Sequence, residues 1–218
     1  MRLSKTLLAV AVFAVAGAAS ASPTTVTVIS SAPTPQVPMT ITFNGGITYG
    51  SNTAVEEYTI TSTSPAGTFA AFCLEPFQHL TSPWVYGNAG TFTVAQADAL
   101  SRLFTGANWR SANSAADGVT SNFQRVGLGV SVWDIFLDGA FNLSAGNVRV
   151  TNDGFGGTAV AFAQASYAAG NTSLAPYLVR LTDPVKQDLV IAIPEPETYA
   201  LMIAGLMAVG FVARRRSR

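Results

Sequence analysis

The end of the chain constrains the rest most strongly, because its last 25 residues join three segments of different character in a fixed order. A triplet of Pro194, Glu195 and Pro196 comes first, and an uncharged apolar run from Tyr199 to Ala213 follows. The chain then closes on four arginines: Arg214, Arg215, Arg216 and Arg218. Prolines fix φ and lack a backbone donor, so the triplet is expected to stay extended and accessible. The apolar run can satisfy its backbone in lipid only as a helix, and the arginines favour the cytoplasmic side. This order predicts a separate C-terminal segment over residues 194–218, with a single transmembrane helix in its apolar run.

The arrangement resembles the PEP-CTERM sorting signal, the tag that exosortase enzymes recognise in many Gram-negative bacteria. The resemblance implies an exported substrate of the secretion translocon and of an exosortase. Such a protein is held transiently in the inner membrane and is then delivered to the cell surface or the extracellular polymeric matrix. The alternative is an ordinary membrane anchor behind a Pro-rich linker. Tyr199–Ala213 has 15 residues, fewer than the roughly 17–25 of a stable span, which favours transient anchoring.

The beginning of the chain has the three regions of a secretory signal peptide. Arg2 and Lys5 supply the positive region, and Leu7–Ala16 is apolar. Ala19-Ser20-Ala21 matches the small-x-small cleavage pattern, so residues 1–21 are predicted to be removed. An uncleaved anchor is the alternative, but the apolar run is short for a transmembrane helix.

Between these ends lie 172 residues, Ser22 to Ile193, which are enough to bury a core. This segment has six basic and ten acidic residues, a net charge of −4. No basic patch is evident that would neutralise phosphates, so nucleic-acid binding is not expected. Richness in Ala, Gly, Thr, Ser and Asn is typical of secreted, β-rich proteins.

The first part of this segment alternates polar and apolar residues with a period of two. Thr24–Ser30 and Met39–Phe43 show the alternation clearly, and Asn44-Gly45-Gly46 reads as a hairpin turn. Val55–Thr61 and Thr68–Leu74 continue the pattern. We expect an antiparallel sheet of four or five short strands here.

The later part changes to helical spacing. Thr93-Val94-Ala95-Gln96 and Ser121-Asn122-Phe123-Gln124 are both capping-box sequences. Three helices are predicted, over residues 93–104, 121–138 and 158–169, followed by a final strand over 188–193. Gly127 and Gly129 in the second helix indicate close approach by a neighbouring backbone. The chain is therefore expected to be α+β, an antiparallel, barrel-like sheet with two or three inserted helices in residues 22–193.

Cys73 is the only cysteine and the one candidate for a reactive thiol. Phe72–Glu75 (FCLE) and Val130–Ile135 (VSVWDI) resemble two elements of the thioester domains of Gram-positive surface adhesins. The resemblance implies a thioester between the cysteine and a glutamine four residues before the tryptophan. Here that position is Gly129, which has no carboxamide, and Gln124 lies nine positions before Trp133. The alternative for Cys73 is a small apolar core residue on a strand.

The remaining candidates are weaker. His79, the only histidine, has no recognisable third group for a Cys-His nucleophile, and a zinc site within the chain would need more ligands. Asn152-Asp153-Gly154 reads as a turn rather than a calcium loop. Asp134 and Asp138, one helical turn apart, read as a solvated helix edge rather than a catalytic carboxylate pair. No metal and no cofactor are expected.

These patterns favour a non-enzymatic structural or adhesive protein of the surface or matrix. Its expected partners are the translocon and an exosortase during processing, the inner membrane transiently, and exopolysaccharide or other matrix components afterwards. A secreted hydrolase is one alternative, although it would need clustered carboxylates or a triad. A covalent adhesin acting through a Cys73 thioester is the other.

Overall fold

The computed structural model describes residues 24–32, 39–43, 47–50, 55, 57–63, 66–78, 84–86, 88–109 and 118–192. The predicted signal peptide (1–21), His79 and the sorting segment (194–218) lie outside the described residues. Among the residues described, no helix is long and apolar enough to cross a membrane.

The described residues form ten strands, three α-helices and one short 3-10 helix. The strands are β1 (Thr24–Ala32), β2 (Thr40–Phe43), β3 (Ile47–Gly50), β4 (Glu57–Thr63), β5 (Ala66–Cys73), β6 (Trp84–Tyr86), β7 (Asn88–Gly90), β8 (Val148–Asn152), β9 (Leu178–Thr182) and β10 (Leu189–Ala192). The helices are α1 (Val94–Gly106), α2 (Asn122–Asp138), α3 (Thr158–Ala169) and the 3-10 helix η1 (Ala175–Tyr177). The α+β class and the three predicted helices are confirmed.

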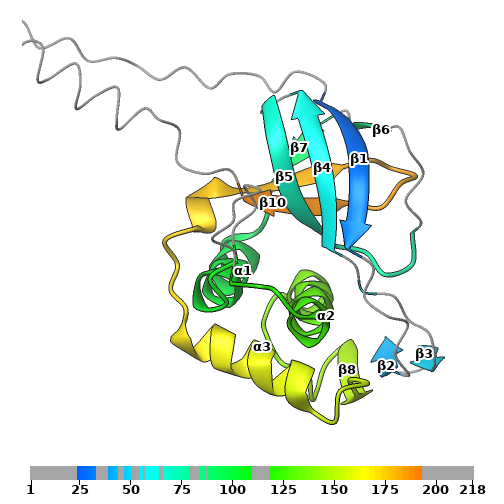
Figure 1. Ribbon diagram of the computed structural model, residues 1–218, viewed down its shortest axis with the longest axis vertical. Helices are drawn as coiled ribbons and strands as arrows, with labels where there is room; N and C mark the ends of the chain where they lie inside the picture. Colours follow the sequence, from blue (N-terminus) through cyan, green and yellow to red (C-terminus); the bar gives the residue numbers. More distant parts are fainter. Residues whose placement is uncertain are drawn as a thin grey trace, which may run out of the picture.

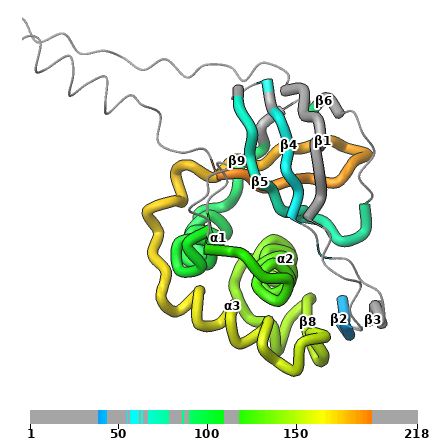
Figure 2. Tube along the Cα trace, in the orientation of Figure 1, coloured from blue at the N-terminus to red at the C-terminus, as the bar shows by residue number. Residues whose placement is uncertain are grey.

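The strands form two antiparallel sheets instead of one (Figure 1). The large sheet has the order β6-β1-β4-β5-β10-β9-β7, and a small sheet has the order β3-β2-β8. The expectation of one barrel-like sheet is therefore wrong. Strand β2 pairs with β3 and with β8 in a separate small sheet. The large sheet is curled, and the hairpin of β9 and β10 (orange) runs across the direction of β4 and β5 (Figures 1 and 2). Its edge strands β6 and β7 are separated by one residue in the chain, but the sheet is not a closed barrel.

Alternation along β5 divides the interior into two cores. Phe72 and Leu74 belong to the core shared with the helices, whereas Ala71 and Cys73 belong to a second core formed by the sheet alone. Successive strand residues point to opposite faces, so neighbours along β5 are buried in different places. The second core consists of Ile60, Phe69, Ala71, Cys73, Tyr86, Leu181, Leu189 and Ile191.

Both predicted capping boxes start their helices. In α1, the Gln96 N–H donates to Thr93 Oγ1 at 3.2 Å and the Thr93 N–H donates to Gln96 Oε1 at 3.0 Å. In α2, the Ser121 N–H donates to Gln124 Oε1 at 2.9 Å. These bonds satisfy backbone donors that have no partner within the helix.

The α2 helix is the centre of the fold, because every residue from Val126 to Ile135 is buried. Helix α2 contacts α1, α3, β5 and β8. A Cβ placed on Gly127 would lie 2.4 Å from the Ala159 carbonyl oxygen of α3, so the expected close approach of a backbone is confirmed at this position. Helix α2 is therefore packed from several sides, and not along one amphipathic face.

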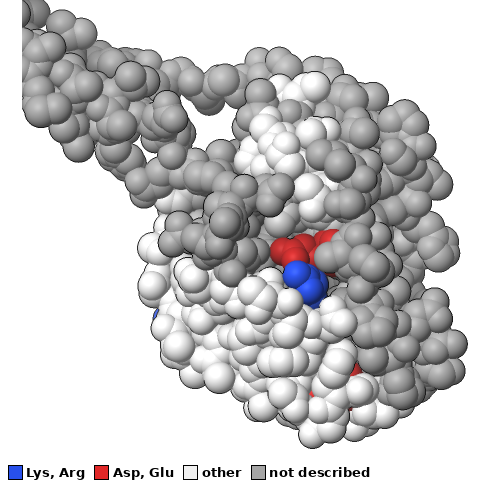
Figure 3. Space-filling model, viewed as in Figure 1, with Lys and Arg blue, Asp and Glu red and all other residues white. Residues whose placement is uncertain are grey.

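An ion pair joins α2 to the sheet near the start of β4. Arg125 Nε donates to Glu57 Oε2 at 3.1 Å, and Trp109 Nε1 donates to Glu57 Oε1 at 2.6 Å. On the face drawn in Figure 3, acidic and basic side chains meet at the seam between sheet and helices. The helical side of that face is otherwise almost uncharged.

Two glycines allow α1 and α3 to cross in direct backbone contact. A Cβ on Gly106 would lie 1.8 Å from the Ser166 carbonyl oxygen, and one on Gly170 would lie 1.7 Å from the Arg102 carbonyl oxygen. The Ser101 hydroxyl reinforces the crossing by donating to the Asn171 carbonyl at 2.8 Å. Each helix thus requires a glycine opposite the other's backbone.

We expect Gly106→Ala and Gly170→Ala each to lower the free energy of unfolding by about 1–3 kcal/mol, because the added methyl meets a carbonyl that no side-chain rotation can move. Chemical denaturation measures the effect. Ala165→Ser, an exposed change on α3, is the control and should alter stability by less than about 0.5 kcal/mol. Unchanged stability in both glycine variants would contradict the close crossing.

Candidate functional site

Cys73 ends β5 and is buried. Its backbone pairs with Leu189 of β10, and the next residue continues the contact because the Leu74 N–H donates to the Asp188 carbonyl at 2.8 Å. The exposed fraction of Cys73 is 6%. Cys73 therefore lies on a strand and belongs to the second core.

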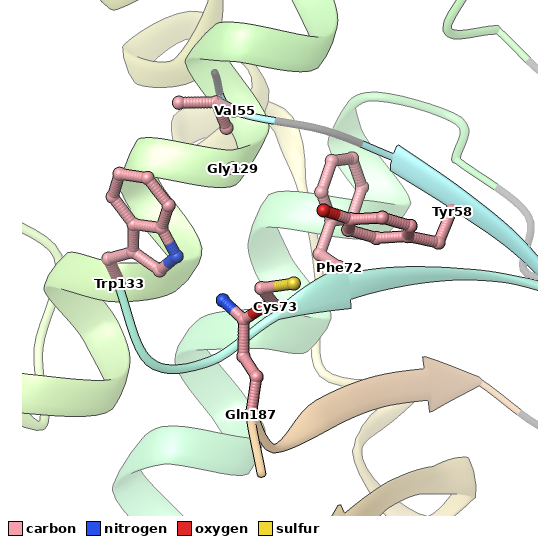
Figure 4. Close-up of a pocket in the computed structure, with 7 residues that line it drawn as sticks. All are labelled: Val55, Tyr58, Phe72, Cys73, Gly129, Trp133 and Gln187. Atoms are coloured by element: carbon pink, nitrogen blue, oxygen red, sulfur yellow. The ribbon is translucent and has the colours of Figure 1, made fainter. Parts of the chain in front are cut away.

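A small cavity of about 20 Å³ lies beside Cys73 (Figure 4). Its lining residues come from β4, β5, α2 and the segments before β4 and β10: Val55, Tyr58, Phe72, Cys73, Gly129, Trp133 and Gln187. Cys73, Gly129 and Trp133, which the sequence pattern paired, are therefore brought together. A cavity of this volume is large enough for one water molecule.

Gly129 faces this cavity without a side chain, and Val55 fills the adjoining space. A Cβ on Gly129 would lie 2.0 Å from Val55 Cγ1, and Val55 is itself 1% exposed. The close neighbour at Gly129 is thus a side chain and not the expected backbone. The position four residues before Trp133 lies next to Cys73, but it has no carboxamide to offer.

Gln124, the glutamine of α2, caps the helix instead of lining the cavity. Its Oε1 accepts hydrogen bonds from the Thr120 and Ser121 N–H groups, both at 2.9 Å. This side chain therefore caps the start of α2 and is not among the residues that line the cavity.

Gln187 is the residue of this site that the sequence pattern missed. Its side-chain Nε2 donates to the backbone carbonyl of Glu75 at 2.6 Å. Its backbone carbonyl accepts from the Tyr86 hydroxyl at 2.8 Å. Because Leu189 pairs with Cys73, Gln187 falls beside Glu75 at the same end of the sheet. Only this strand pairing could have revealed it, since residues 187 and 73 are far apart in the sequence.

The indole of Trp133 adds a hydrogen-bond donor to the cavity. Its Nε1–H is buried and has no hydrogen-bond partner within the described part of the chain. In Figure 4 the indole nitrogen points to the side on which Cys73 and Gln187 lie. A buried donor without a partner is costly, so this side of the cavity favours a small hydrogen-bond acceptor.

Acidic groups surround the buried end of β5. Burial raises the pKa of Glu75, the nearby Asp188 raises it further, and Arg180 opposes both. Burial also raises the pKa of Tyr86 far above its usual value, and the neighbouring Cys73, Asp188, Asp183 and Glu75 act in the same direction. These surroundings disfavour additional negative charge.

Arg180, a residue of β9, supplies positive charge next to these acidic groups. Its Nη2 and Nε donate to Asp188 Oδ2 at 2.6 and 2.8 Å, and its guanidinium carbon lies 4.6 Å from the centre of the Phe136 ring. Contact with an aromatic face and a carboxylate together holds the guanidinium in place. Arg180 thereby connects α2 to the end of the large sheet that carries Gln187.

The structure corrects the interpretation of Asp134 and Asp138. Asp134 was expected on a solvent-exposed edge of the helix, but it is fully buried. The reason is that α2 is buried on all sides from Val126 to Ile135. Asp134 Oδ2 accepts from the Asn142 N–H at 2.6 Å. Asp138, one turn later, accepts from the Asn147 N–H.

Asp153 caps α3, in keeping with the predicted turn at Asn152-Asp153-Gly154. Its carboxylate accepts from the N–H groups of Phe155, Gly157 and Val160 at 2.8–3.0 Å. Burial alone would raise the pKa of Asp153, but these donors outweigh it and lower the pKa. Within the described ranges, no group of three or more His, Cys, Asp or Glu side chains is arranged to hold a metal ion.

We expect Gly129→Ala to lower the free energy of unfolding by about 1–3 kcal/mol, because the methyl overlaps the Val55 side chain. Val55→Ala removes the overlapping atoms, so the double variant should recover most of the loss attributed to Gly129→Ala. A double-mutant cycle by chemical denaturation measures this coupling. Additive effects would show that the two residues are not in contact.

No protein-family model, curated protein or solved structure matches the chain. The two resemblances therefore rest on the motifs themselves, which are the tail Pro194–Arg218 and the pair of elements around Cys73 and Trp133.

Proposed function

We propose that this chain is an exported protein that an exosortase processes and that then serves as a structural or adhesive component of the cell surface or extracellular matrix. The observation that carries the proposal is the tail, in which the Pro-Glu-Pro triplet, the apolar run and the arginines follow one another in order. The signal-peptide pattern at residues 1–21 supports export independently.

The position of β10 supports processing at the triplet. This strand lies between β5 and β9 in the large sheet, and it ends at Ala192, one residue before Ile193 and two before Pro194. Cleavage at the triplet would leave every described strand within the released protein. The folded domain would therefore survive the loss of its tail.

The described grooves favour a structural or adhesive role over a hydrolase. A groove of about 390 Å³ beside β8 and α3 is lined by one carboxylate, Asp153, whose oxygens cap the helix. Of the Asp134–Asp138 pair, Asp134 is fully buried and out of reach of a polymer substrate. A glycosidase would need two carboxylates facing one substrate.

Changing Pro194, Glu195 and Pro196 together to alanine should leave the unprocessed precursor in the membrane fraction of a host that has the exosortase. Fractionation and immunoblotting of a tagged protein measure this, and deleting the exosortase should have the same effect. Glu197→Ala is the matched control, because it removes a neighbouring charge and keeps the triplet. Normal release of the triple variant would refute the proposed sorting role.

A second candidate function is covalent adhesion, and the observation that favours it is the Gln187 carboxamide in the same cavity as Cys73. In such a step the Cys73 sulfur attacks the Gln187 Cδ, the C–N bond breaks, and the thiol proton leaves with ammonia. A partner amine would then displace the sulfur, forming an amide and restoring the thiol. Gln187 would supply the acyl group that Gly129 cannot.

Intact-mass measurement of the purified protein tests this second candidate. A thioester lowers the mass by about 17 Da, through loss of ammonia, and methylamine treatment restores a thiol and adds the amine. Cys73→Ala and Gln187→Ala should each abolish both effects. A full mass together with a thiol that alkylates in denaturant would exclude the thioester.

A further inference from the structure

The last two turns of α2 carry two carboxyl groups outside the cavity site. Asp134 and Asp138 are four residues apart, so their side chains lie on the same side of the helix. Asp134 is fully buried, and among the residues that the structure describes its Oδ1 accepts no hydrogen bond. Its Oδ2 is taken by the Asn142 N–H at 2.6 Å.

Asp138 holds the other end of the same loop. Its Oδ1 and Oδ2 accept from the Asn147 N–H at 3.0 and 2.8 Å, and Oδ2 also lies 3.4 Å from the Val148 nitrogen. Gly146 packs directly on this carboxyl, because a Cβ there would lie 2.3 Å from Asp138 Oδ2. The two carboxyls therefore clasp residues 139–147, and Val148 begins β8.

The clasp connects the loop to the small sheet. Strand β8 pairs with β2, and the Val150 N–H donates to the Leu143 carbonyl of the loop at 2.9 Å. The loop contains no ionisable side chain. The ionisable groups of the neighbouring elements are Arg149 on β8, Tyr167 on α3, and Asp98 and Arg102 on α1.

Two carboxyls one helical turn apart cannot both be charged cheaply when one of them is buried. Burial raises the pKa of Asp134 to about 7, the Asn142 N–H opposes the rise, and the neighbouring Asp138 adds to it. Asp138 is thus the carboxyl that acts on Asp134. A proton shared between the two carboxyls would give Asp134 Oδ1 the hydrogen bond that it otherwise lacks.

We propose that Asp134 and Asp138 form a proton-binding latch: one proton held between the two carboxyls keeps the loop 139–147 on α2, and its loss loosens the loop and β8. The sign follows from the direction of the shift. A carboxyl whose pKa is raised by folding stabilises the closed form at low pH, and this stabilisation is lost as pH rises through about 7. The latch is independent of the sorting and adhesive roles.

Amide hydrogen exchange of the full chain tests the latch directly. After correction for the intrinsic pH dependence of exchange, protection of the Asn142 and Asn147 amides should fall about 10-fold between pH 6 and pH 8. Amides in the middle of α1 should keep their protection over the same range. Equal protection of the loop amides at both pH values would overturn the proposal.

Asp134→Asn should keep the loop protected at pH 8. The amide oxygen can still accept from Asn142, and the NH₂ can donate to Asp138 without titrating. Asp98→Asn on α1 is the matched control and should leave the wild-type pH dependence unchanged. If Asp134→Asn retains the 10-fold loss of protection, another group is responsible and the latch is refuted.

Two further measurements test whether the carboxyls act as a pair and whether the pair binds a proton. Asp138→Asn removes the like charge, so the pH at which the loop loosens should fall, and an unchanged midpoint would overturn the pairing. If Asp134→Asn does not fold, the Asp138→Asn variant alone tests whether the two carboxyls act as a pair.

Calcium added to the wild type at pH 8 should not restore protection of the loop amides. Restoration would show that the pair binds a cation and not a proton.

Discussion

The packing of α2 is the constraint on which the rest of the structure depends. A helix buried from Val126 to Ile135 must bring every neighbour close. Gly127 lets α3 approach through its backbone, and Gly129 leaves space for Val55. Because protein interiors are packed as densely as crystals, these two positions determine how closely α3 and the segment before β4 approach α2.

The same packing produces both polar sites of the domain. On one side, Trp133 directs its indole toward the end of β5, where Cys73 and Gln187 meet. Toward the end of the helix, Asp134 and Asp138 hold the loop that leads to β8. A helix surrounded by protein has no solvent face for polar side chains, so each one must find a partner inside or bear the cost of having none.

Local signals predicted the helices well. Thr93 with Gln96, and Gln124 with Ser121, form their bonds within one turn, so the sequence contains everything that the start of each helix needs. Long-range features were less accessible. The pairing of β2 with β8, the arrival of Gln187 beside Cys73 and the burial of Asp134 all depend on contacts between distant segments.

The sequence alone determined the α+β class, the extent of the helices and the prediction that Cys73 is a buried strand residue, because periodicity, caps and turns are local properties. It also carries the whole argument for export and sorting, since those patterns lie in residues 1–21 and 194–218. The tertiary structure decided that the strands divide into two sheets, that Val55 fills the space beside Gly129, and that the carboxyl of Asp134 is buried. These outcomes depend on which surfaces pack together, and a one-dimensional pattern does not specify that choice.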